Sequence, residues 1–280
     1  MIENRPWMTV FSHFILVLGV FIVALPVWVA LVASTHPASA FGSGHIPLWF
    51  GQEGLTNWQL MLFGQDGQST QLLKMTLNSL IMALGITFGK IAISLMSAYA
   101  IVFFRFPFRG LAFWIIFFTL MLPVEVRIVP TYEVIANLNL LNSYTGLTLP
   151  LIASATATFL FRQCFMTMPN ELVEAARIDG AGPIRFFFDI LLPMSRTNIA
   201  ALFVILFIYG WNQYLWPLIV TTDDAYYTLV MSVKRMLSVS EGDIQWNQVM
   251  VSTLLAMIPP VMVVVAMQKL FVKGLVDAEK

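Results

Sequence analysis

Six stretches of this sequence are apolar over about the length that an α-helix needs to cross a membrane. A hydrocarbon core of about 30 Å takes roughly 20 helical residues. The runs cover about 11–34, 76–104, 110–130, 146–166, 198–221 and 248–270. Backbone polar groups in lipid must pair within their own segment or a closed barrel, so apolar runs of this length indicate helices. The runs therefore predict an all-α, polytopic membrane protein with six transmembrane helices.

The composition excludes a soluble globular protein. Of the 280 residues, 59% are hydrophobic and only 11% are charged, whereas about a quarter are charged in a typical soluble domain. The mean hydropathy is +0.81. Little sequence remains outside the apolar runs, so we expect a single transmembrane domain over residues 1–280.

The distribution of lysine and arginine predicts the orientation, because short positively charged loops stay in the cytoplasm. With both termini inside, ten of the 15 Lys and Arg residues lie on the cytoplasmic side and four on the other. Ala38-Ser39-Ala40 is similar to a signal-peptide cleavage site, but the preceding apolar run exceeds the 7–15 residues typical of such peptides. We therefore expect a retained first span and cytoplasmic termini.

A charged segment, residues 169–193, separates two of the apolar runs. Asn170 is expected to cap a short helix whose first turn carries Glu174, since amide oxygens accept from free N–H groups there. Gly180 suits the left-handed conformation that ends a helix, and Pro183 suits the first turn of another. The segment therefore predicts a compact helix–turn–helix on the cytoplasmic side.

Ala175 and Ala176 are strong helix formers with small side chains, so a partner surface is expected to approach the backbone closely there. Gly180 and Pro193 complete the pattern E-A-A-x3-G-x9-I-x-L-P, and Asp179, at a variable position just before the glycine, is also a candidate docking residue. The alternative is an ordinary amphipathic loop that contacts no partner.

The segment 85–90 is superficially similar to a phosphate-binding loop. That motif has four residues between its glycines and Ser or Thr after the lysine, whereas here three residues separate Gly85 from Gly89, and Ile91 follows Lys90. The two glycines instead indicate a small-xxx-small face for close helix packing. ATP hydrolysis is therefore not expected of this chain.

Lys90 lies within an apolar run, where a charge is costly unless it faces protein, water or an anion. It is a candidate functional residue; the alternatives are snorkelling along its own helix or pairing with a carboxylate. Glu125 and Arg127 pose the same choice: they pair with each other at the interface, or Arg127 offers a bidentate guanidinium to a phosphate-bearing solute.

Trp211, Asn212 and Gln213 belong to an aromatic and amide-rich stretch in the fifth run. Aromatic residues commonly mark the membrane interface. Amides at membrane depth instead need a partner or a wet cavity, which makes these residues candidates for lining a pathway. The three histidines do not have metal-ligand spacing, so no metal site is expected.

The E-A-A pattern resembles the cytoplasmic coupling loop of permease subunits in binding-protein-dependent ABC importers. Most of the chain is similar to the sugar-type branch of that family, and most of all to the E-type permease subunits of sn-glycerol-3-phosphate importers. The stretches that carry this likeness are 119–127, 153–158, 207–213 and 274–277.

The resemblance implies a type I ABC importer permease fold and a multi-pass protein of the bacterial inner membrane. It implies as partners a second, different permease subunit, two copies of an ABC ATPase subunit and a periplasmic solute-binding protein. ATP and magnesium would be used by the ATPase subunits, with no cofactor in this chain and no contact with nucleic acid. Glu174 would contact the ATPase surface, and Ala175, Ala176 and Gly180 would permit close docking.

The solute implied is sn-glycerol-3-phosphate or a related glycerophosphodiester. Many sugar-type relatives have Glu where this chain has Gln213, which fits an anionic solute. A neutral sugar or polyol is the alternative within the family. An ion-coupled secondary transporter would use Lys90, Glu125 and Arg127 as a relay, but the hydropathy pattern has no inverted repeat. An enzyme acting on lipid headgroups would need a catalytic constellation that the sequence lacks.

Overall fold

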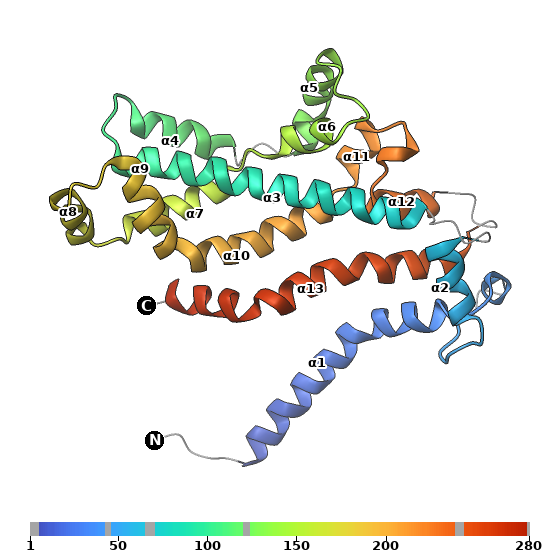
Figure 1. The fold of residues 1–280 in the computed structure, drawn as a ribbon. Coiled ribbons are helices and arrows are strands. Elements are labelled where there is room, and N and C mark those ends of the chain that lie inside the picture. Colours follow the sequence, from blue (N-terminus) through green and yellow to red (C-terminus); the bar gives the residue numbers. More distant parts are fainter. Residues whose placement is uncertain (1–5, 43–45, 65–70, 120–123, 239–243, 279–280) are drawn as a thin grey trace. The chain divides into compact units, whose positions relative to one another are not determined.

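The structure is a computed structural model that describes residues 6–42, 46–64, 71–119, 124–238 and 244–278, without the side chains of Pro6, Val124, Glu125 and 269–278. All regular structure in these ranges is helical (Figure 1). The chain divides into two compact units. Unit 1 comprises residues 1–74 and 232–258, and unit 2 comprises residues 75–231 and 259–280.

The helices follow one another with short connections. They are α1 (Pro6–Ala33), η1 (Ala38–Phe41), α2 (Gly54–Phe63), α3 (Gln71–Phe103), α4 (Arg109–Phe118), α5 (Val124–Asn137), α6 (Tyr144–Thr148), η3 (Leu149–Leu151), α7 (Ala155–Met166), α8 (Asn170–Ile178), α9 (Pro183–Arg185), η4 (Phe186–Leu191), α10 (Leu192–Trp211), α11 (Leu215–Val220), η5 (Asp224–Tyr226), α12 (Leu229–Met236) and α13 (Trp246–Ala278).

The prediction of an all-α membrane protein is confirmed, but the count of six spanning helices is not. Four helices in the described ranges are long and apolar enough to span a membrane: Trp7–Ala33, Gln71–Phe103, Pro183–Trp211 and Trp246–Gln268. The pair Tyr144–Leu151 and Ala155–Met166, bent by 51°, makes a fifth span if the two helices cross together. The run 146–166 is therefore a broken helix rather than a straight one.

The expected span 110–130 is described in two parts, because residues 120–123 lie outside the described residues. Its first part is α4, an apolar helix of 10 residues, which is about 15 Å and half the thickness of the hydrocarbon core. Its second part belongs to α5, which carries Glu125, Arg127 and Pro130. α4 packs against α7, and α5 packs against α11, so the two helices contact different parts of unit 2.

The expected span 198–221 also has different limits. The helix begins at Pro183, within the segment predicted as a loop, and ends at Trp211. A separate helix, α11, follows after the non-helical residues at 213–214. The continuous apolar composition hides this interruption, because composition alone does not indicate where a helix ends.

Unit 1 joins α1 to α2 and the start of α13 through one buried amide. Asn57 donates from Nδ2 to the carbonyls of Ser34 and His36 at 3.0 and 2.9 Å, and its Oδ1 accepts from Asn247 at 3.2 Å. Only 11% of the apolar window in Trp7–Ala33 is buried in the chain. Most of α1 therefore presents its apolar side chains outward.

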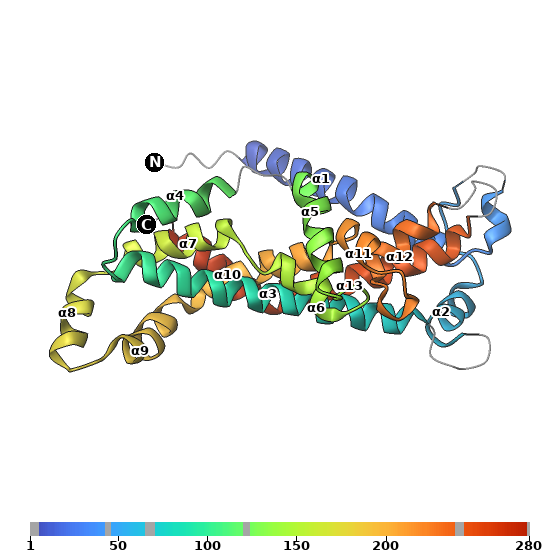
Figure 2. The same cartoon turned by 90° about the horizontal axis from the view of Figure 1, so that it is seen from above.

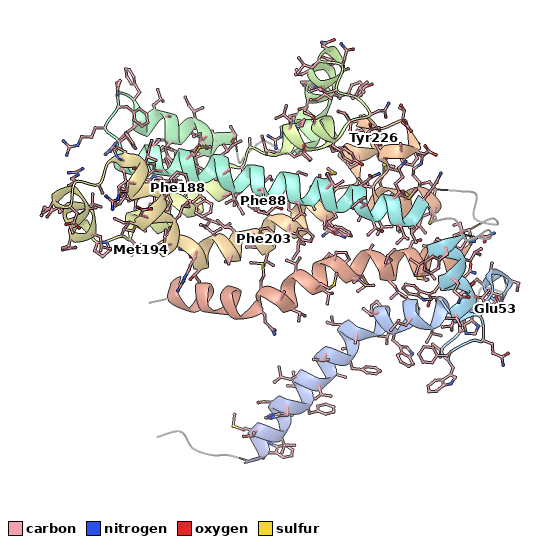
Figure 3. The ribbon with its side chains drawn as sticks, viewed as in Figure 1. Glu53, Phe88, Phe188, Met194, Phe203 and Tyr226 are labelled. Carbon is pink, nitrogen blue, oxygen red and sulfur yellow. The ribbon has the colours of Figure 1, made fainter. Side chains whose placement is uncertain are left out.

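In unit 2, the central helix α3 packs closely against two segments distant in sequence. A Cβ added at Gly89 would lie 2.5 Å from Cγ2 of Ile152, and one added at Gly85 would lie 3.0 Å from Cγ2 of Thr148. This confirms the prediction that these glycines allow close packing. α10 also approaches α3, where the tilted rings of Phe88 and Phe203 have centroids 5.7 Å apart (Figure 3).

The two ends of unit 2 carry different elements: α8 and α9 lie at one end, and α5, α6 and α11 lie toward the other (Figures 1 and 2).

We call the second end the polar brace, because side-chain hydrogen bonds of Asn78, Asn142 and Tyr144 join its loops. Asn78 donates to the carbonyls of Ala225 and Tyr227, each at 2.9 Å. Its Oδ1 accepts from the Tyr144 hydroxyl at 2.7 Å. The carboxamide Oδ1 of Asn142 accepts from two backbone N–H groups at 222 and 223.

Candidate functional site

Helix α8, at the end of unit 2 opposite the polar brace, carries the Glu-Ala-Ala motif. It ends as predicted at Gly180, which has φ +72°, in the left-handed region. The N–H of Ala181 donates to the carbonyl of Ala176 at 2.9 Å, and the N–H of Gly180 donates to the carbonyl of Arg177 at 3.1 Å. These two bonds form a Schellman motif, which satisfies carbonyls that a helix end leaves free.

The start of α8 differs from the prediction. Asn170 is the first helical residue and not the cap; Pro169 occupies the cap position without a side-chain bond. The N–H of Leu172 bonds instead to the carbonyl of Pro169 at 3.2 Å. The helix therefore begins directly after Pro169, with a backbone hydrogen bond and no side-chain cap.

The two alanines of the motif face in opposite directions. Glu174 and Ala175 are exposed, whereas Ala176 is only 4% exposed and belongs to the core of unit 2. The small side chain at 176 therefore lets α8 pack on its own subunit, contrary to the expectation that it faces a partner. Asp179 and Gly180 are exposed at the turn.

An aromatic cluster attaches this motif to α3. The Tyr99 hydroxyl donates to the carbonyl of Pro183 at 2.9 Å, and the Tyr99 ring lies 5.1 Å from that of Phe187 and 6.3 Å from that of Phe186. A pocket of about 220 Å³ remains between these rings and α8. The loop is thus held to the membrane helix by one hydrogen bond and by ring contacts.

Pro183 begins α9 as predicted, and the chain then continues as one helix through the π-helical segment Phe186–Leu191 into α10. Pro193 lies in the first turn of α10. A proline inside a helix has no N–H for the carbonyl four residues earlier, here that of Asp189, and its ring needs extra room. The wider π turn directly before Pro193 supplies that room.

Sequence reasoning missed the apolar surface of this region. Ile178 is 85% exposed, Ile184 76% and Phe188 60%; Phe188 is labelled at this end of unit 2 in Figure 3. Large apolar side chains that are exposed together commonly mark an interaction surface. The mixture of charged and apolar residues from 171 to 190 is the sequence signal that could have indicated this surface.

Lys90 lies in a second candidate region of unit 2, midway along α3. It is only 6% exposed, and its ammonium nitrogen lies 3.6 Å from the centroid of the Tyr209 ring. It makes no hydrogen bond or ion pair with the described residues. A buried cation held over an aromatic face keeps its charge available to a ligand, because the ring quadrupole attracts but does not neutralise it.

Lys90 and Arg127 line the same pocket, which has a volume of about 500 Å³. None of the lining residues whose side chains the structure describes is acidic. The polar remainder consists of hydroxyl groups, from Ser97, Thr119, Ser154, Thr156, Thr158 and Tyr209. Two cations among hydroxyls form a site suited to an anion.

The pocket is located where the fifth span is broken. Ser154 follows the break and caps α7 by accepting from the N–H of Ala157 at 3.2 Å. The N-terminus of a helix has a positive partial charge, so the break directs a third favourable group toward the pocket. Sequence reasoning did not identify Ser154, Thr156 or Thr158, although the run 153–158 alternates small and hydroxyl residues.

The other predicted pathway residues lie apart from this pocket. Trp211 is buried, with its ring 6.0 Å from that of Phe207, so it belongs to the core. Asn212 is exposed at the end of α10, and Gln213 donates to the carbonyl of Tyr209 at 3.1 Å. The side chain of Glu125 lies outside the described residues, so its pairing with Arg127 stays a prediction.

Comparison with known proteins identifies the family. The family described as "Binding-protein-dependent transport system inner membrane component" matches residues 90–277. The chain is 59% identical, over 100% of both chains, to the sn-glycerol-3-phosphate transport system permease protein UgpE of Escherichia coli K12. It is 58% identical to the protein of the same name from Shigella flexneri serotype 5b, again over the full length of both.

The fold is similar to that of solved transporters. One is a bacterial ABC transporter involved in the import of the acidic polysaccharide alginate, with a TM-score of 0.80 and 17% identity over 96% of this chain and 98% of that one. A second is the alginate transporter in complex with a periplasmic protein that binds an alginate pentasaccharide, with a TM-score of 0.62 and 16% identity over 94% and 93% of the two chains. Together with the full-length relatives, these matches show that the chain belongs to the inner membrane components of binding-protein-dependent transport systems, the permease subunits of ABC importers.

Proposed function

We propose that this chain forms half of the translocation pathway of an ATP-driven importer for sn-glycerol-3-phosphate or related glycerophosphodiesters. The observation that carries the proposal is 59% identity over the whole of both chains to a permease named for that solute. Identity of this level over the full length of both chains favours a shared solute over a shared fold alone.

The pocket around Lys90 supports an anionic solute. In the proposed site the ammonium of Lys90 supplies a point charge, and the guanidinium of Arg127 supplies two parallel donors that match phosphate oxygens. Thr156 and Thr158 also line the pocket, and hydroxyl groups suit the glycerol moiety. A neutral sugar would leave the buried charge of Lys90 without a partner, which is unfavourable.

The proposed complex contains a second, different permease subunit, two copies of an ATPase subunit and a periplasmic solute-binding protein. The solved alginate transporter, which binds a periplasmic protein, supports this composition. ATP and magnesium belong to the ATPase subunits in this proposal. The chain itself carries out no covalent chemistry, since the segment 85–90 lacks the spacing of a phosphate-binding loop.

We assign the segment 169–193 as the coupling loop, on the cytoplasmic side together with both termini. Exposed Glu174 and Ala175 and the exposed side chains of Ile178 and Ile184 would contact an ATPase subunit. ATP binding would move this loop and so bias the paired permeases between inward-facing and outward-facing states. The excess of lysine and arginine on this side supports the orientation.

Reconstitution of the complete complex tests the solute. We expect sn-glycerol-3-phosphate, delivered by the binding protein, to stimulate ATP hydrolysis, and glycerol or a neutral sugar to have no effect. Lys90→Met, which keeps the apolar stem, should raise KM for uptake by about tenfold, as expected for loss of one charged contact. Lys74→Met, at an exposed position in the same helix, serves as the control. Stimulation by a neutral sugar instead, or an unchanged KM in the Lys90 variant, would contradict the proposal.

A further inference from the structure

A second pocket in unit 2 contains two arginines that the proposed function does not use. It lies between α3, α4 and α7 and has a volume of about 510 Å³. Arg109 and Arg162 line it together with Gln163, and its other walls are apolar and largely aromatic. None of the described lining residues is acidic, so the positive charge is not compensated within the pocket.

Arg162 is the central residue of this pocket. Its Cζ lies 4.2 Å from the centroid of the Phe113 ring, and its Nε is buried without a hydrogen-bond partner among the described residues. A buried donor without a partner is unfavourable, and more so when it belongs to a charged group. A guanidinium stacked on a ring also has its plane held in place, which leaves its N–H edge available for a planar or tetrahedral anion.

Arg109 supplies a second, adjustable cation. It is the first residue of α4 and is exposed, and its Nη1 makes only a long contact of 3.5 Å with the carbonyl of Phe104. Two guanidinium groups, one fixed and one mobile, match the several oxygens of a phosphoryl group better than those of a single carboxylate. The amide of Gln163 adds an uncharged donor.

We propose that Arg162 and Arg109 form a second phosphoryl-binding site, separate from the pocket of Lys90. The two pockets follow one another along the same helices. Residues 90–97 of α3 and 155–158 of α7 line the first, and residues 101–102 and 159–166 line the second. The positions 90 and 101 are about 16 Å apart along a helix axis. The distribution of lysine and arginine puts this second site at the cytoplasmic end of the two helices.

The phosphoryl group has two sources. It belongs to the transported solute, which would then pause at a second position on its way to the cytoplasm, or to the headgroup of an anionic phospholipid of the inner leaflet. The solute case rests on the proposed function, and the lipid case does not. The apolar side chains of Leu111 and Trp114, exposed on α4 beside the pocket, suit an acyl chain as well as a neighbouring protein.

The test uses the complete complex in vesicles of phosphatidylcholine alone, or of phosphatidylcholine with phosphatidylglycerol. Arg162→Gln removes the stacked charge, and Arg105→Gln removes an exposed arginine that lines neither pocket. If the solute binds, Arg162→Gln raises KM for sn-glycerol-3-phosphate uptake in phosphatidylcholine by about tenfold. If the lipid binds, phosphatidylglycerol raises the midpoint of thermal unfolding of the wild-type complex, and Arg162→Gln abolishes that rise.

Either result supports the site, provided that Arg105→Gln behaves as wild type. An Arg162→Gln complex with wild-type KM and a wild-type response to phosphatidylglycerol overturns the proposal, even if its kcat falls, because a purely structural arginine would give that result. If Arg162→Gln does not assemble, Arg109→Gln at the exposed position replaces it, with the same expected directions and the same overturning result. The unfolding measurement contains no solute, so it tests the site even if sn-glycerol-3-phosphate fails to stimulate the complex.

Discussion

The polar brace and the coupling loop, at the two ends of unit 2, are stabilised by different means. At the brace, buried Asn78 makes three hydrogen bonds to parts of the chain that are distant in sequence. At the coupling loop, Ile178, Ile184 and Phe188 are exposed, and Tyr99 provides the single hydrogen bond to α3. The difference is that buried side-chain hydrogen bonds join the loops of the brace, whereas ring contacts and the hydrogen bond of Tyr99 hold the coupling loop to α3.

The largest expected effect is at the coupling loop. Replacing Glu174 and Gly180 together by alanine removes an exposed carboxylate and forces a non-glycine residue into φ +72°. We expect uptake to fall on the order of a hundredfold, the upper range of coupling free energies, while ATP hydrolysis continues. Uptake and hydrolysis are measured on the same vesicles.

Glu133→Ala is the matched control, since Glu133 is an exposed carboxylate on α5 at the brace end. It should leave both activities unchanged. Wild-type uptake in the Glu174 and Gly180 double variant would refute the assignment of the loop, and equal losses in both variants would show that the two ends do not differ in function.

The next effect concerns stability at the brace. Asn78→Leu removes the three hydrogen bonds that Asn78 makes with the Tyr144 hydroxyl and with two carbonyls, and each lost buried bond costs about 1–3 kcal/mol. We expect the free energy of unfolding in detergent to fall by about 3 kcal/mol. Thr87→Val in the same helix removes only a bond to the carbonyl of Ala83, and about 1 kcal/mol is expected. Equal losses in the two variants would rule out a special role for the brace.

A smaller effect is expected at the glycines between the two ends. A Cβ at Gly89 would lie 2.5 Å from Ile152, at the break before α7, so Gly89→Ala should destabilise the protein by about 2 kcal/mol through overpacking. Gly110, in α4, has no neighbour within 4 Å of such a Cβ. Gly110→Ala should instead raise the unfolding free energy by about 0.5 kcal/mol. Chemical unfolding curves of both variants decide, and a loss at Gly110 as large as that at Gly89 would contradict the packing argument.

The smallest effect compares one tyrosine hydroxyl at each end. Tyr144→Phe leaves the buried Oδ1 of Asn78 without its 2.7 Å donor, and a loss of about 1.5 kcal/mol is expected. Tyr99→Phe frees a more accessible carbonyl at Pro183, so its loss should be about 0.5 kcal/mol. We expect the reverse order for coupling, with uptake per ATP hydrolysed lower in Tyr99→Phe. If Tyr144→Phe impaired coupling more, the proposed division of roles would be wrong.

Sequence patterns predicted the features that local chemistry determines. The apolar runs located α1, α3 and α13, because length and composition suffice for a long helix. Gly180 adopts the left-handed conformation, and Gly85 and Gly89 allow close packing, since each follows from the absence of a Cβ. The family followed from spaced residues in a single loop.

The features that sequence patterns missed depend on contacts between distant segments. α4 packs against α7 and α5 packs against α11, and composition does not reveal these contacts. The burial of Ala176 depends on its contacts with the core of unit 2, which the spacing of the motif does not reveal. The contact of Lys90 with Tyr209 joins α3 to α10, so a pattern within either helix gave no sign of it.

The uninterrupted helix from Pro183 to Trp211 has a mechanical consequence. Gly210 rests directly on α3, since a Cβ there would lie 3.0 Å from Cα of Ala83, and this contact is a natural fulcrum. Between Gly210 and Pro183 the helix is about 40 Å long, so a tilt of about 5° about that fulcrum displaces Pro183 by about 3.5 Å. If the helix tilts as a rigid rod, a displacement of several ångströms at the loop would correspond to a rotation of only a few degrees beside Tyr209.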